Sequence, residues 1–476
     1  MKPTHSIHPL LLKILAAAGI ALAPIAALAA VPDSVAEAAA PAIHTDRLIV
    51  KYKDAGPAVM RNGKAVAAQA VTMSSARKAA VDRAGQQFGV MMRHSHRIAT
   101  GADILQLDRR VSPAEASALA AELMARDPSV EYAEPDTIML PLMTPTDPYY
   151  NQQWHYFETA GGLRLPAAWD KASGTGVKVA VIDTGYRPHA DLSGQILQGY
   201  DFIGDIATAG DGNGRDSDAS DPGDSTTANQ CGAGQPARSS SWHGTHVAGT
   251  VAARTNNGTG VSGVAYNAKV VPVRVLGKCG GYTSDIADGI IWASGGAVSG
   301  VPANANVAKV INMSLGGSGA CGSTTQNAIN GARSRGTVVI IAAGNSNANV
   351  SNFTPANCAG VVAVAAVGRT GGKASYSNYG ALVDVAAPGG DGSSTNGVLS
   401  TLNSGTTTPG SDNYAWYQGT SMAAPHVAGV AALMLSKNST LTPDQIESKL
   451  KSSARAFPAT CSQCGTGIVD ANAAVQ

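Results

Sequence analysis

The fold is decided by the stretch Val179-Ala-Val-Ile-Asp-Thr-Gly185, in which a short apolar run ends at an aspartate and a glycine. Comparable apolar, β-branched runs occur at 177–182, 269–276, 309–313, 337–343 and 361–367. Such runs are typical of parallel strands that are buried on both faces. Helical patterns alternate with them at 243–253, 285–293, 325–335, 421–435 and 443–454. The alternation predicts an α/β domain with a doubly wound parallel sheet and helices on both faces. Its functional groups are expected at the carboxyl ends of the strands.

The segment before this domain has a different pattern. Strand-like runs occur at 47–53, 103–107 and 130–133, and helical patterns at 75–87 and 113–126. A strand-helix-strand-strand-helix-strand order predicts a small ferredoxin-like α+β unit. Residues 137–148 contain three prolines and are expected to form an extended linker.

Residues 1–29 are predicted to be an export signal peptide. Lys2 and Lys13 precede an apolar run that closes on Ala27-Leu28-Ala29, the small-x-small pattern of a signal-peptidase site. A membrane anchor is the alternative, but Pro24 and the small residues at the end of the run favour cleavage. We therefore expect a secreted protein without stable membrane association, whose six cysteines are bridged.

The composition excludes two classes of protein. The 34 Lys and Arg balance 33 Asp and Glu, whereas a general nucleic-acid binder carries a basic excess. Only the N-terminus of the 476-residue chain carries a long apolar run, which excludes a membrane protein with several spans.

Three residue types needed for nucleophilic catalysis stand at the ends of predicted elements. Asp183 ends a predicted strand, and His243 and Ser421 each open a predicted helix. Serine becomes a nucleophile when a base takes its proton, and an acid holds that base in the right tautomer. The N-terminus of the serine's helix favours the negative charge of a developing oxyanion.

Each of these residues also has a plainer interpretation. Asp183 could cap a turn, and Ser421 could be an ordinary helix N-cap. His243 and His246 are three residues apart, which raises the possibility of a zinc site. The zinc-protease helix instead has histidines at i and i+4 with a nearby glutamate. Taken together, the three side chains favour catalysis over these interpretations.

Four segments resemble the subtilisin family of serine proteases: Val181-Ile-Asp-Thr-Gly185, His243-Gly-Thr-His-Val-Ala-Gly249, Ala342-Ala-Gly-Asn345 and Gly419-Thr-Ser-Met-Ala-Ala-Pro425. The chain order Asp, His, Ser is also that of the family. The resemblance covers about residues 145–476 and implies a serine endopeptidase. By this resemblance Asp183 orients the base, His243 is the general base and then the general acid, and Ser421 attacks the peptide carbonyl. Asn345 would donate its side-chain amide to the oxyanion.

The resemblance also implies a self-processing precursor. Residues 47–136 are similar to the family's inhibitory pro-domain. We expect a signal peptide at 1–29, a pro-domain with its linker at 30–143 and a subtilisin-like catalytic domain at 144–476, with self-cleavage near Met143–Thr144. The expected partners are protein and peptide substrates, and the pro-domain as a transient inhibitor. The mature enzyme is expected to be a monomer.

Family substrates pair with two segments, which here look like Gly280-Gly281-Tyr282 and Ser314-Leu315-Gly316. Backbone pairing makes little demand on sequence, so broad specificity is expected. The pocket for the residue before the cut is expected to involve 342–344 and the acid-free loop after Asn345, which favours a large apolar residue. One alternative is a processing protease selective for basic residues, which needs acids in that pocket. The other is an inactive binding protein, which the filled catalytic positions disfavour.

Calcium is the expected cofactor, at two candidate sites. The loop Thr255-Asn-Asn-Gly-Thr-Gly-Val261 resembles the family's strong calcium loop. Its ligands would be Asn257, the carbonyls of Thr255, Thr259 and Val261, and the carboxylates of Asp147 and Asp191. The second candidate is the acidic loop 211–224, although the twelfth-position glutamate of an EF-hand is absent. Its ligands would be Asp211, Asp216, Asp218, Asp221 and Asp224, and a solvated acidic loop is the alternative.

We expect three disulfides. Cys231 is paired with Cys279 and Cys321 with Cys358, because their loops lie at the same end of the predicted sheet. The pair Cys461-Ser-Gln-Cys464 could be a redox motif, but it lies far from any strand-to-helix start. A small structural loop is therefore expected there.

Overall fold

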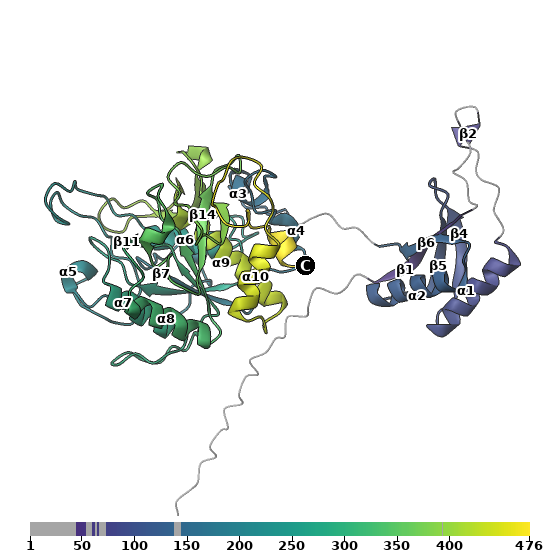
Figure 1. Ribbon diagram of the computed structural model, residues 1–476, viewed down its shortest axis with the longest axis horizontal. Helices are drawn as coiled ribbons and strands as arrows, with labels where there is room; N and C mark the ends of the chain where they lie inside the picture. The colour runs from purple at the N-terminus through teal and green to yellow at the C-terminus, as the bar shows by residue number, and fades with distance from the viewer. Residues whose placement is uncertain (1–43, 54–59, 62–63, 66–72, 138–143, 393) are drawn as a thin grey trace, which may run out of the picture. The chain divides into compact units, whose positions relative to one another are not determined.

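The computed structural model describes residues 44–53, 60–61, 64–65, 73–137, 144–392 and 394–476 (Figure 1). The predicted signal peptide lies outside the described residues. The chain divides into two units, Met1–Met139 and Leu140–Gln476. Within the ranges given above, no helix is both long and apolar enough to cross a membrane.

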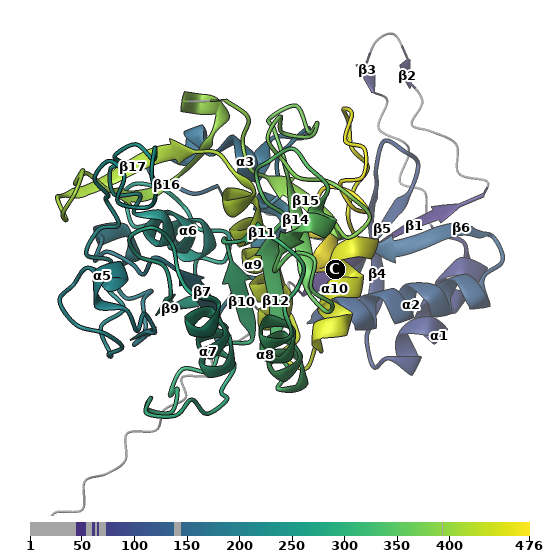
Figure 2. The same ribbon diagram turned by 60° about the vertical axis from the view of Figure 1, so that its left-hand side comes forward.

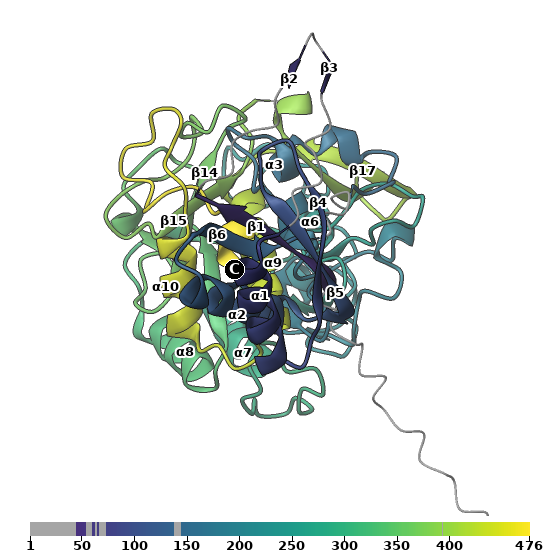
Figure 3. The ribbon, with the colours of Figure 1, turned by 90° about the vertical axis from the view of Figure 1, so that its right-hand side faces the viewer.

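The first unit contains a four-stranded antiparallel sheet in the order β4-β5-β1-β6. Its helices α1 and α2 lie side by side on one face (Figure 3). The elements are β1 (Thr45–Tyr52), α1 (Ser75–Gln87), β4 (Met92–Arg97), β5 (Asp103–Val111), α2 (Pro113–Arg126) and β6 (Val130–Pro135), with a small pair β2 (Met60–Arg61) and β3 (Lys64–Ala65). These elements, apart from β2 and β3, follow the predicted β-α-β-β-α-β order. Leu48, Leu105 and Leu119 are fully buried at the centre of this unit's core.

The second unit is organised around a seven-stranded parallel sheet in the order β15-β14-β12-β10-β7-β9-β8. Its strands are β7 (Lys178–Asp183), β8 (Tyr200–Asp201), β9 (Lys269–Arg274), β10 (Val310–Met313), β12 (Val338–Ala342), β14 (Val362–Val367) and β15 (Val385–Pro388). In β7, Val179 and Val181 belong to one core cluster, whereas Ala180 and Ile182 belong to the other. Burial on both faces is why this strand is apolar at each position from Val179 to Ile182 rather than at every second one.

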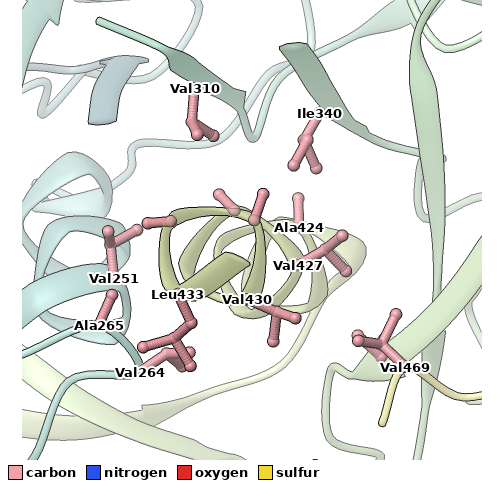
Figure 4. Close-up of a cluster of buried hydrophobic side chains, with 14 of the residues drawn as sticks. Val251, Val264, Ala265, Val310, Ile340, Ala424, Val427, Val430, Leu433 and Val469 are labelled. Carbon is pink, nitrogen blue, oxygen red and sulfur yellow. The ribbon is translucent and has the colours of Figure 1, made fainter. Parts of the chain in front are cut away.

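Helices cover both faces of the sheet. On one face lie α6 (His243–Ala252), α9 (Thr420–Lys437) and α10 (Pro443–Ser452), and on the other lie α7 (Thr283–Ala293) and α8 (Ser323–Ser334). Figure 2 shows α7 and α8 side by side. Every residue of α9 from Met422 to Leu435 is buried. Figure 4 shows this helix surrounded by Val310 and Ile340 of the sheet and Val251 of α6. A helix that is apolar all round is stable only when enclosed in this way.

Short elements complete the second unit. They are α3 (Trp154–Phe157), α4 (Pro166–Trp169), α5 (Ile206–Ala209), α11 (Ala471–Ala474), the strand pair β11 (Gly317–Ser318) and β13 (Phe353–Thr354), the hairpin β16 (Val398–Asn403) and β17 (Asp412–Tyr417), and the 3-10 turns η1 (Tyr150–Gln152), η2 (Ala190–Leu192), η3 (Val350–Asn352) and η4 (Ser394–Asn396).

The three predicted disulfides are present. Cys231 is bonded to Cys279, Cys321 to Cys358 and Cys461 to Cys464. The first two close chain segments of 48 and 37 residues, and such closures restrict the unfolded chain.

Candidate active site

The end of β7 and the start of α6 bring an acid and an imidazole together. Asp183 is the last residue of β7 and is fully buried, and His243 is the first residue of α6. His243 Nδ1 lies 2.7 Å from Asp183 Oδ1, an oxygen that also accepts the Thr184 N–H at 2.8 Å. Since Asp183 Oδ1 is the acceptor, Nδ1 carries the proton and the lone pair is left on His243 Nε2.

The charge of Asp183 changes the basicity of His243. Burial alone would lower the pKa of His243, but the charge of Asp183 and the hydrogen bond to it raise that pKa above 6.5, helped by Asp224 and Asp221. The neighbouring His246 is different, because burial lowers its pKa to about 3. His246 Nε2 donates to the carbonyls of Val398 and Ala415, so it does not join His243 in a zinc pair.

Ser421 is the second residue of α9, and its main chain is tied to the end of β10. Pro425 has no N–H to bond the Ser421 carbonyl within the helix, and Ser314 Oγ donates to that carbonyl instead, at 2.8 Å. Ser421 Oγ in turn donates to the Ser314 carbonyl at 3.1 Å. Asn312 Nδ2 donates to Ser314 Oγ at 3.0 Å, which ties a third side chain to this junction.

Asn345 follows β12 and faces the same junction. Its Oδ1 accepts both the N–H and the hydroxyl of Thr420, each at 2.8 Å, so its Nδ2 is left to donate elsewhere. A Cβ on Gly419 would lie 3.5 Å from both Asn345 Nδ2 and the Ser421 backbone nitrogen. The two N–H donors therefore border one small space beside Ser421. Donors arranged in this way can stabilise an oxyanion.

Two residues that support Asn345 escaped the sequence analysis. One is Thr420, which fixes the amide orientation just described. The other is the buried Asn378, whose Oδ1 accepts from the backbone of Ser346 and Ala348 and whose Nδ2 donates to the Ala343 carbonyl. Neither belongs to a sequence pattern that marks a catalytic residue, although Thr420 lies inside the quoted segment around Ser421.

A cleft of about 810 Å³ contains His243. All five predicted substrate-binding residues line it: Gly280, Gly281, Ser314, Leu315 and Gly316. Asp224 and Arg238 are the charged side chains of its lining beside His243, and residues 342–344 are not part of it. The two predicted substrate segments thus lie on the cleft that holds the imidazole.

The first predicted calcium group is gathered in one place. Asp147 carboxylate oxygens accept from the backbone of Asn256 and Asn257 and from Ser262 Oγ, and Asp191 accepts from Asn257 Nδ2 and the Val261 N–H. Both carboxylates are buried, and burial, with the nearby charge of Asp147, raises the pKa of Asp191 to about 6. No basic side chain in the described ranges forms an ion pair with either one. Two buried carboxylates without a basic partner fit a divalent cation.

The carboxylates of the second predicted calcium group all have protein partners, and calcium binding by this loop stays a prediction. Each carboxylate of the acidic loop has its own partner: Asp211 pairs with Arg274, Asp216 and Asp218 accept from their own loop, Asp221 accepts from Thr184 Oγ1, and Asp224 accepts from Ser241. Among the residues that the structure describes, no three His, Cys, Asp or Glu side chains gather as metal ligands, either at this loop or at the first predicted group.

Known proteins match both the sequence and the fold. A model of the Subtilase family matches residues 174–467. An extracellular protease of Xanthomonas campestris pv. campestris is 57% identical over 431 residues, which are 90% of this chain and 72% of that protein. An extracellular basic protease of Dichelobacter nodosus is 44% identical and covers 90% of this chain, which spans 70% of it.

The solved structures include a protease from Pseudoalteromonas arctica with 70% sequence identity and a TM-score of 0.69. The match covers 70% of this chain and 99% of that one. A shared fold alone does not require sequence identities of 44 to 70% or a family match over most of the second unit. The chain therefore belongs to the Subtilase family of serine endopeptidases.

Proposed function

We propose that this endopeptidase cleaves peptide bonds through Asp183, His243 and Ser421, with Asn345 as an oxyanion donor. The observation that carries the proposal is the 2.7 Å contact between His243 Nδ1 and Asp183 Oδ1 on a cleft that also holds the substrate segments. A serine-directed phosphonate is the test, because it labels an active nucleophile and leaves an inactive binding protein of the same fold unlabelled.

The geometry supports an acyl-enzyme mechanism. The Ser421 hydroxyl turns from the Ser314 carbonyl toward His243 and attacks the substrate carbonyl as Nε2 takes its proton. Asp183 stabilises the resulting imidazolium through Nδ1–H. The oxyanion accepts from the Ser421 N–H and from Asn345 Nδ2. His243 then protonates the leaving amine, and a water molecule repeats the sequence to release the acyl group.

The raised pKa of His243 predicts where activity is lost in acid. Only neutral His243 can accept the serine proton, so kcat/KM should fall as pH decreases through a midpoint above 6.5. The measurement is kcat/KM for a neutral peptide substrate as a function of pH. A midpoint below 6.5 would show that the carboxylates around His243 do not stabilise its protonated form.

For specificity, we propose broad cleavage with a preference for a large apolar residue before the cut. Asp224 is the acid that lines the cleft, and both of its oxygens accept from Ser241, at 2.6 and 2.7 Å. These hydrogen bonds hold the carboxylate beside Ser241, and the loop after Asn345 contains no acid, which disfavours the alternative of a protease selective for basic residues. A cleavage profile on a peptide library separates the two.

We further propose that the protein is secreted as a precursor. The extracellular relatives and the predicted signal peptide support export, and the β-α-β-β-α-β unit supports a pro-domain that acts as a transient inhibitor. The expected self-cleavage site near Met143–Thr144 falls at the edge of the described residues. The mature product is expected to be a monomer that acts on protein and peptide substrates.

We also propose calcium at the first group, held by the side chains of Asp147, Asp191 and Asn257 and the carbonyls of Thr255, Thr259 and Val261. The bound ion would neutralise two buried carboxylates and tie the segment at Asp147 to the body of the unit. Ligand held about 100-fold above its dissociation constant adds about 2.7 kcal/mol to the folded state.

A chelator should therefore shorten the half-life of the enzyme at elevated temperature, and added calcium should restore it. Asn257→Ala or Asp147→Ala should mimic the chelator while leaving initial peptide hydrolysis unchanged. For a protease the effect is kinetic, since opened molecules are digested by their neighbours. Equal inactivation rates with chelator and with calcium would contradict the proposal that calcium binds at this site.

A further inference from the structure

One buried carboxylate near the triad enters the mechanism above only through its charge, which helps to raise the pKa of His243. Asp221 lies in the acidic loop and is 1% exposed, so it does not contact substrate. Its Oδ1 accepts the Gly223 N–H at 2.8 Å, and its Oδ2 accepts the Thr184 hydroxyl at 2.8 Å. Thr184 directly follows Asp183 at the end of β7.

The Thr184 hydroxyl joins three chain segments. Besides donating to Asp221, its oxygen accepts the backbone N–H of Gly244, the second residue of α6, at 3.0 Å. A hydroxyl has a single proton, and here that proton goes to Asp221. The carboxylate therefore sets the direction of the hydroxyl, whose free lone pair then faces the start of the helix that carries His243.

The backbone that follows β7 lies very close to the backbone at the start of α6. A Cβ added to Gly244 would lie 2.1 Å from the Gly185 carbonyl oxygen, so only glycine fits at this position. The preceding residue, Trp242, has a left-handed backbone with φ of 48°, a conformation that its surroundings must enforce. Small displacements of α6 here would move His243 directly, because His243 lies between Trp242 and Gly244.

We propose that Asp221 is a positioning residue for the catalytic base: through the Thr184 hydroxyl it fixes the start of α6 against the end of β7. This holds His243 Nδ1 within hydrogen-bonding distance of Asp183 Oδ1. The inference rests on the proposed triad and deepens it, and it gives one carboxylate of the acidic loop a role that does not depend on calcium.

A double-mutant cycle tests the proposal on the full chain. Thr184→Val keeps the shape of the side chain but removes the hydroxyl. Asp221→Asn also keeps the shape, but its amide NH₂ takes the place of one carboxylate oxygen. One of the two donors, the Gly223 N–H or the Thr184 hydroxyl, then loses its acceptor. Each change should lower kcat by about 10- to 100-fold with little change in KM, the scale of a misplaced catalytic group. Thr184→Ser, which keeps the hydroxyl, should restore most of kcat.

The coupling between the two changes is the decisive quantity. If Asp221 acts through Thr184, Asp221→Asn should cost little further kcat in the Thr184→Val background. Asp205→Asn is the matched control, since this exposed residue caps α5 and asparagine caps as well as aspartate. Thermal unfolding of each variant, with its activity blocked by a phosphonate, shows whether it is folded.

Three results would overturn the proposal: unchanged kcat in folded Thr184→Val, equal kcat in Thr184→Ser and Thr184→Val, or independent losses from the two changes in the double variant. None of these touches the triad itself. The triad is tested separately, by the activity of Ser421→Ala and by covalent labelling of Ser421, so the two failures are distinguishable.

Discussion

Ser421→Ala should abolish peptide hydrolysis, with kcat lowered by about 10⁶-fold, the scale measured in this enzyme family for loss of the nucleophile. Without the hydroxyl no acyl-enzyme can form, and His243 has no proton to take from residue 421. Because the precursor is expected to cut itself, the same change should leave the signal-free precursor at full size.

The measurement is hydrolysis of a peptide substrate, together with the size of the purified chain on a denaturing gel. Ser351→Ala is a suitable control, since Ser351 is an exposed serine in η3. It should mature and cleave like the unchanged protein. Normal processing of the Ser421→Ala precursor would contradict both the assignment of Ser421 as the nucleophile and the expectation that the precursor cuts itself.

Asn345→Ala should lower kcat by about 10²–10³-fold with little change in KM, again a magnitude measured in this family. The amide Nδ2 is placed to donate to charge that develops only in the transition state. Such an interaction affects turnover and not substrate binding.

Asn345→Asp refines this test. Aspartate keeps an oxygen to accept from Thr420, the contact that Asn345 Oδ1 makes at 2.8 Å, but it has no donor for the oxyanion. It should lose at least as much kcat as the alanine variant. A raised KM with unchanged kcat in Asn345→Ala would make this residue a substrate-binding group.

The parallel sheet could be predicted because its signal is local. A strand such as β7 is apolar at four consecutive positions, Val179 to Ile182, since both of its faces are covered. Strands with no such run, or with a very short one, were missed. β4 reads Met-Arg-His-Ser-His-Arg and is mostly exposed, β8 has two residues, and β15 is an apolar run of four residues that ends at Pro388. These strands are selected by their pairing partners and not by their own composition.

The triad could be predicted because each of its residues ends or opens an element inside a distinctive segment. The hydrogen-bond partners of the acidic loop could not be predicted from the sequence, because carboxylate composition does not reveal them. Asp211 pairs with Arg274 across 63 residues, and Asp221 bonds Thr184 across 37. Likewise, the buried contact of 2.8 Å between His155 Nδ1 and His426 Nε2 joins residues 271 apart. Such pairs exist only once the chain has folded.

The central claim is that Ser421 is the nucleophile activated by His243 and Asp183. The most direct measurement is the site of covalent labelling by a serine-directed phosphonate on the mature enzyme, mapped by peptide mass spectrometry. We expect one adduct, on the peptide that contains Ser421, and its loss in His243→Ala. An adduct on another serine, or full activity in an enzyme that takes up no label, would contradict this account.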